Sequence, residues 1–219
     1  MVLLSRMSVA RILVGTVALI VLPSLSFAET VGRTSAVVPN AKQTPPGGGT
    51  STLAMSAPIY RNATLQTSSS AALEVTFVDN SKLSMGQNSE MVVDEFTYAG
   101  PGSASSQALS FGRGVFRYVS GAVQKDKVKL RTPNATIGIR GTKVRIRNDG
   151  DGSSTVGVED ERKPDEHGNP PPPDKAHTCS EIDVVTNSGQ KLTLKCGEYV
   201  RIEADGSLGD VQFGNVPGC

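Results

Sequence analysis

Apolar and polar residues alternate in many short runs along this chain. In residues 73–77 (LEVTF), Leu, Val and Phe alternate with Glu and Thr, and alternation resumes in residues 82–85 (KLSM). A period of two places one set of side chains on one face of a strand. The Asp79-Asn80 pair between the two runs favours a turn. The segment therefore predicts a β-hairpin.

Similar runs recur at short intervals, and they are broken by turn residues. Asn187-Ser188-Gly189 separates two of them and predicts another hairpin, with Gly189 in the left-handed region, Ile182 opposite Leu194 and Val184 opposite Leu192. After the N-terminal apolar segment, no stretch of ten or more residues shows a helical period. The pattern predicts an all-β domain, a sandwich, roll or barrel. The expected strands lie within residues 91–98, 109–111, 115–119, 127–131, 143–147, 155–160, 182–185, 192–194 and 199–202.

The N-terminal segment predicts export. Arg6 and Arg11 precede the apolar run Ile12–Leu22. Ser26-Phe27-Ala28 follows it and has the small-x-small pattern of a signal-peptide cleavage site. These features are typical of a secretory signal peptide over residues 1–28, with a retained anchor as the alternative. Export would place the protein in the periplasm or outside a bacterial cell, with no membrane span after cleavage.

Composition divides the remaining chain. Residues 29–57 are rich in Pro, Gly, Ser and Thr and predict a disordered linker. The β domain is expected over 58–205, with a charged, proline-rich insertion loop at 160–178 and a C-terminal tail at 206–219. The formal net charge of +1 gives no reason to expect nucleic acid as a partner.

The segment TPNATIGIRGT (132–142) combines a strand pattern with backbone-shaping residues. Ala135, Ile137 and Ile139 share one face. Pro133 has no N–H to donate and fits a strand start, an edge strand or a bulge, and Gly138 predicts a bulge or the close approach of another backbone. Gly141 would free the chain to turn. We interpret Thr132, Pro133, Gly138, Gly141 and Thr142 as a structural motif.

This segment, with Arg131, resembles the core motif of the FecR domain family. IYRNATLQTSSSAALEVTFVDNSKLSMGQNSEMVVDEFTYAG (59–100), LSFGRGVFRYVSGA (109–122) and GEYVRI (197–202) resemble the family's opening, pre-motif and closing segments, in the right order. The resemblance implies an antiparallel β-sandwich of jelly-roll or double-stranded β-helix type. The best-known members regulate iron uptake and join a cytoplasmic anti-sigma segment to a periplasmic FecR domain. Only 28 residues precede the predicted cleavage site, so we expect a stand-alone exported module.

Basic residues are the candidates for ligand contact. Arg140 lies between two glycines and could bind a carboxylate or phosphate, or it could pair structurally with a carboxylate of this chain. Lys125, Lys127, Lys129 and Arg131 are expected along one strand face, and Lys143, Arg145 and Arg147 along another. Such stripes fit a protein or an anionic envelope polymer, or they are ordinary solvated faces.

Other chemistry finds little support in the sequence. The two histidines, His167 and His177, could join Asp174 and Cys179, but the spacing matches no zinc signature. Asp149–Gly152 (DGDG) fails the calcium-loop pattern and favours a tight turn. No histidine lies within a predicted strand to act as a base. We therefore expect no cofactor, no metal and no catalytic residues.

The three cysteines predict one disulfide and one free thiol. Cys179 and Cys196 flank the hairpin and are the favoured pair. In the expected register Ser180 faces Cys196, so a bulge or a frayed end is needed for the bond. Together the sequence predicts an exported, non-enzymatic binding domain. The alternative is a sensor component of an envelope signalling (sigma-factor regulatory) system with an uncleaved N-terminal anchor.

Overall fold

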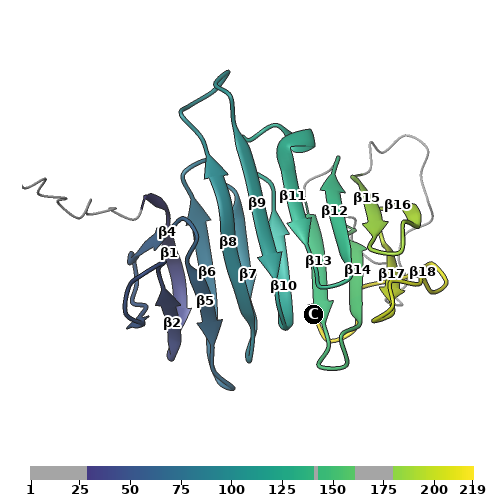
Figure 1. Ribbon diagram of the computed structural model, residues 1–219, viewed down its shortest axis with the longest axis horizontal. Helices are drawn as coiled ribbons and strands as arrows, with labels where there is room; N and C mark the ends of the chain where they lie inside the picture. The colour runs from purple at the N-terminus through teal and green to yellow at the C-terminus, as the bar shows by residue number, and fades with distance from the viewer. Residues whose placement is uncertain (1–28, 141–142, 161–179) are drawn as a thin grey trace, which may run out of the picture.

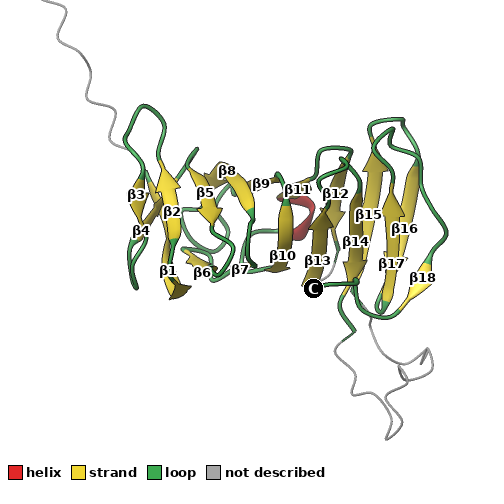
Figure 2. Ribbon diagram, turned by 90° about the horizontal axis from the view of Figure 1, so that it is seen from below, coloured by secondary structure: helices red, strands yellow, loops and turns green. Residues whose placement is uncertain are grey.

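A computed structural model describes residues 29–140, 143–160 and 180–219. Two sheets of nine strands each enclose one hydrophobic core (Figures 1 and 2). The predicted all-β sandwich is confirmed, and the single helical element in the described ranges is the 3-10 helix η1 (Lys125–Lys127).

The order of the strands in space differs from their order in the sequence. Sheet A consists of β18 (Gln212–Phe213), β17 (Glu198–Ile202), β14 (Ser154–Val158), β13 (Lys143–Asn148), β10 (Gly114–Val119), β7 (Lys82–Met85), β6 (Ala72–Phe77), β1 (Thr30–Val38) and β4 (Pro58–Tyr60). Sheet B consists of β16 (Lys191–Lys195), β15 (Glu181–Thr186), β12 (Ala135–Ile139), β11 (Val128–Arg131), β9 (Ser106–Phe111), β8 (Glu90–Thr97), β5 (Thr64–Thr67), β2 (Ala41–Thr44) and β3 (Ser51–Thr52).

The chain advances along the sandwich from one end to the other. After every one or two strands it crosses to the opposite sheet, so the colours in Figure 1 run in order along the long axis. Neighbouring strands are antiparallel, except that β9 and β11 are parallel. A chain that passes back and forth between two facing sheets in this way is arranged as in a double-stranded β-helix. Most strand neighbours in space are therefore close in sequence.

The core follows the predicted alternation. In β6, Leu73, Val75 and Phe77 point inward and are almost fully buried, and β6 pairs with β7 as the expected hairpin. Phe77 stacks on Phe96 from sheet B with ring centroids 5.3 Å apart. Each such large apolar side chain stabilises the fold by roughly 1.5–3 kcal/mol.

The expected disordered linker is wrong, because residues 30–52 supply β1, β2 and β3. β1 lies between β4 and β6, and Val31 and Ala41 are fully buried. A Cβ at Gly32 would lie 2.9 Å from the carbonyl oxygen of Thr76. The strand therefore needs a small residue at this position, and small residues make the segment look like a linker.

The expected C-terminal tail is also partly structured. β18 pairs with β17, and Val216 is buried against the outer face of sheet A. The predicted signal peptide (1–28) and residues 161–178 of the proline-rich insertion lie outside the described residues. Within the described ranges, no helix is long and apolar enough to cross a membrane.

Candidate ligand-binding surface

β12 carries the described part of the segment that begins at Thr132. Ala135, Ile137 and Ile139 point into the core, as predicted, and β12 lies between β11 and β15. Before the strand, Thr132 N donates to the carbonyl oxygen of Ala135 (2.9 Å), and Ala135 N donates to Thr132 Oγ1 (3.1 Å). Pro133 is exposed at this turn, in keeping with a strand start. Gly141 and Thr142 lie outside the described residues.

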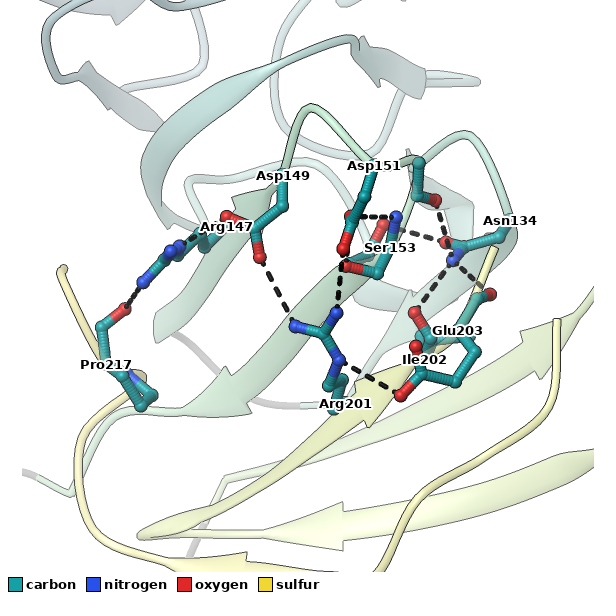
Figure 3. A network of polar contacts seen from close by, with 11 residues as sticks. Asn134, Arg147, Asp149, Asp151, Ser153, Arg201, Ile202, Glu203 and Pro217 are labelled. Atoms are coloured by element: carbon teal, nitrogen blue, oxygen red, sulfur yellow. Dashed lines mark hydrogen bonds and ion pairs between the residues drawn. The ribbon is translucent and has the colours of Figure 1, made fainter. Parts of the chain in front are cut away.

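Asn134 is the structural residue of this segment that the sequence did not single out. Its buried side-chain Nδ2 lies 3.3 Å from the carbonyl oxygen of Gly152. The same atom donates to the carbonyl oxygens of Ile202 (3.0 Å) and Glu203 (2.8 Å), as Figure 3 shows. Its Oδ1 accepts hydrogen bonds from Ser154 Oγ (2.7 Å) and Thr132 Oγ1 (2.9 Å). This amide ties β12 in sheet B to β14 and β17 in sheet A.

Arg140 is paired with a carboxylate of the same chain. Its Nε donates to Asp183 Oδ2 on β15 (2.6 Å), and Thr193 Oγ1 on β16 donates to Asp183 Oδ1 (2.8 Å). The Thr193 hydrogen bond, followed by the hydrogen bond and charge of Arg140, holds the pKa of Asp183 below its ordinary value against a partial desolvation. The Arg140 side chain remains 66% exposed, so it differs from a buried structural arginine.

The Arg140–Asp183 pair separates two grooves on the outer face of sheet B. The first groove has a volume of about 470 Å³ and is lined by Lys125, Asp126, Lys129, Gly138, Ile139 and the pair itself. The second has a volume of about 350 Å³ and is lined by Val184, Val185, Lys191, Leu192, Thr193 and the pair. We call them the Gly138 groove and the Val185 groove.

The expected bulge or close backbone approach at Gly138 is wrong. Gly138 pairs regularly with Lys129 on β11 and with Asp183 on β15, without a register shift. The nearest atom to a Cβ built at this position is the carbonyl oxygen of Asp183, 4.0 Å away. No segment among the described residues covers this part of sheet B, so the missing side chain leaves open space in the groove instead of making room for another backbone.

The expected basic stripe on one strand is only partly present. Residues 125–127 form η1, so β11 carries only Lys129 and Arg131 on its outer face. Arg131 Nη1 pairs with Asp94 Oδ2 (3.2 Å) beside a separate groove. Lys127 Nζ pairs with Asp126 (3.3 Å). The structure thus brings Lys129 and Arg140 together at the Gly138 groove and leaves Lys127 and Arg131 outside it.

The second basic stripe lies on β13, in sheet A, and is largely neutralised. Arg145 and Arg117 approach Glu159 with nitrogen–oxygen distances of 3.5 and 2.7 Å. Glu159 is partly buried, which raises its pKa, but the hydrogen bond from Arg117 and the charges of Arg145, Arg117 and Lys143 hold the pKa below its ordinary value. Arg147 binds Asp149 (2.7 Å) and the carbonyl oxygen of Pro217 (3.1 Å), as Figure 3 shows.

Metal-binding groups are not assembled in the part of the chain that is described. There, no three His, Cys, Asp or Glu side chains gather as ligands, and His167, His177, Asp174 and Cys179 lie outside that part. Asp149 and Asp151 are engaged by Arg201 (3.5 and 3.0 Å), and Asp151 Oδ1 accepts from Ser153 N (2.9 Å), so Asp149–Gly152 forms a braced turn (Figure 3).

The hairpin register around Cys196 is confirmed. Ile182 lies opposite Leu194, Val184 opposite Leu192, and Gly189 has φ of 86°. Cys219 is a free thiol. Because Cys179 lies outside the described residues, the Cys179–Cys196 disulfide stays a prediction.

Part of the chain is similar to a known family. The family model described as FecR protein matches residues 63–160. No curated protein matches the sequence.

Two solved structures resemble the fold. Both are crystal structures of a proposed anti-sigma factor from Parabacteroides distasonis, with TM-scores of 0.47 and 0.49 and sequence identities of 12% and 13%. Each match covers 69% of this chain and 60% of the matched chain.

Proposed function

We propose that this FecR-like protein is an exported, non-enzymatic binding module that acts in the periplasm or outside the cell and binds a protein ligand on the outer face of sheet B. The observation that carries the proposal is the Gly138 groove. It is open, and Lys125 and Lys129 beside it have no ion-pair partner among the described residues. Uncovered cations at a concave surface attract an acidic partner.

Site-specific photocrosslinking tests this proposal. A photoreactive residue at Thr136, on the outer face of β12, should give crosslinked protein species in living cells of the source bacterium. The same residue at Ser84, on the outer face of β7 in sheet A, is the matched control. Crosslinks from position 136 alone support a partner on sheet B. Failure of position 136 to crosslink any protein would reject the proposal.

A second function, sensing in an envelope signalling system, is favoured by the FecR match. In that case the N-terminal segment stays as a membrane anchor. Ligand binding to the domain then produces a signal that is transmitted to a partner protein across the membrane. Cell fractionation with N-terminal sequencing separates the two functions. A soluble chain that begins at Glu29 supports the exported module, whereas an intact N-terminus in the membrane fraction supports the sensor.

A further inference from the structure

Gly138 lies in a regular strand where its backbone needs no glycine. Its φ is outside the left-handed region, its pairing is regular, and a Cβ would meet no atom closer than 4.0 Å. Glycine inside a strand weakens it. What glycine provides here is space on the outer face, between Lys129 on one side and the Arg140–Asp183 pair on the other.

Gly157 shows within the same molecule how such a space is used. It lies in β14 on sheet A, and a Cβ there would come within 2.7 Å of both Val216 Cγ2 and Tyr199 Cβ. Val216, from the segment after β18, therefore fills the space over Gly157, and only 2% of Val216 is exposed. A side chain from another segment thus docks over a strand glycine. Nothing in the described chain fills the equivalent space over Gly138.

The charges around the Gly138 groove select the occupant. Asp183 is neutralised by Arg140 and Asp126 by Lys127, whereas Lys125 and Lys129 have no ion-pair partner within the described ranges. Two uncompensated ammonium groups favour a carboxylate. Across the Arg140–Asp183 pair, the Val185 groove presents the apolar side chain of Val185, which is 39% exposed. This second surface favours an apolar side chain, which a protein offers and a simple anionic polymer does not.

We infer that the two grooves take an extended segment of a protein partner that places a carboxylate over Gly138 and an apolar side chain against Val185. The inference rests on the proposed function and specifies its ligand. Extended peptides direct successive side chains to opposite faces, so residues two apart along the segment are the ones that enter neighbouring grooves.

Peptide selection tests the inference. Random short peptides displayed on phage are selected against the purified protein, residues 29–219, and the binding of the recovered peptides is measured by fluorescence anisotropy. We expect an Asp or Glu at a fixed position with an apolar residue nearby. Lys129→Gln should weaken binding about tenfold, the size of a lost charge-assisted hydrogen bond. Gly138→Val should weaken binding at least as much, because its side chain fills the groove.

One variant on the same sheet face serves as the control. Lys195→Gln removes the same charge as Lys129→Gln, but Lys195 lines neither groove. It should keep affinity within about twofold. Lys129→Gln is a surface change, so it gives a result even if Gly138→Val does not fold.

Three outcomes would overturn the inference: selection without an enriched acidic position, acidic peptides that bind Lys129→Gln as tightly as wild type, or a groove that binds dextran sulfate but no peptide. Photocrosslinking separates this failure from failure of the proposed function. Crosslinks from position 136 that persist in the Gly138→Val protein would leave the binding module standing and reject the peptide in the grooves.

Discussion

At the scale of single residues, the amide of Asn134 joins segments that are distant in sequence. Replacing it with Ala removes a buried donor and acceptor and leaves the carbonyl oxygens of Ile202 and Glu203 without this donor. We expect Asn134→Ala to lower the free energy of unfolding by about 2–3 kcal/mol, measured by urea denaturation. Asn187→Ala is the control, because its exposed bond to the carbonyl oxygen of Pro133 (3.0 Å) should contribute less than about 1 kcal/mol. Equal losses would mean that the buried network does not hold the sheets together.

The buried side chain of Tyr118 should make the free energy of unfolding fall as the pH rises into the alkaline range. Its fully buried hydroxyl donates to Gln107 Oε1 in sheet B (2.5 Å), and burial, followed by the charge of Asp79, raises the pKa of Tyr118 far above its ordinary value of 10.0. The folded protein therefore holds this proton more tightly than the unfolded chain does. This contribution to stability is complete below pH 10.0 and decreases above it, by at most about 1.4 kcal/mol per pH unit.

Urea denaturation at about pH 9 and about pH 11 measures this effect. Stability should fall more steeply with pH for the wild-type protein than for Tyr118→Phe, which has no hydroxyl to titrate. Parallel pH dependences would show that Tyr118 does not supply the difference.

At the scale of elements, local sequence patterns identified the strands, but they did not show which other segments pack against the outer faces of those strands. Alternation in residues 73–77 and turn residues at 187–189 are local signals, and both hairpins were predicted with the correct partners. Gly138 was predicted to lie against another backbone, whereas Gly157 is the glycine that another segment covers. A sequence shows that a glycine is present, but only tertiary structure decides whether its space is filled. For the same reason the sequence allowed Arg140 to pair with a carboxylate of this chain but did not show that the partner is Asp183.

The two strand glycines should respond in opposite ways to the same substitution. At Gly157 an Ala Cβ must displace Val216 or Tyr199, so Gly157→Ala should destabilise the protein by about 1–3 kcal/mol. At Gly138 there is room, and a residue with less freedom in the unfolded chain should leave stability unchanged or raise it by up to about 1 kcal/mol. Urea denaturation of the two variants checks the contrast. A destabilising Gly138→Ala would indicate that the groove is not open.

At the scale of the whole molecule, the sandwich was predictable but its first end was not. The sandwich follows from many short alternating runs. β1 lacks that signal because its pairing with β6 shifts register between Thr34 and Ala36, and its pairing with β4 shifts between Thr30 and Gly32. Such bulges break the period of two. Its inward positions also hold Val31, Gly32 and Thr34 instead of large apolar residues, so composition pointed to a linker.

Truncation measures what this first end contributes. A protein that starts at Pro58 lacks β1, β2 and β3, so β6 and β5 each lose a neighbouring strand and the core loses Val31, Ala41 and Leu53. Because each strand of the sandwich contacts mainly its neighbours, removing an end exposes the next core layer and leaves unpaired strand edges. We expect the truncated protein to melt well below the intact 29–219 protein, or to aggregate, as measured by circular dichroism and size-exclusion chromatography.

Deleting the exposed residues 46–49 between β2 and β3 is the control, because it removes linker-like sequence without removing a strand. A truncated protein as stable as the intact one would show that residues 29–57 do not contribute to the stability of the domain.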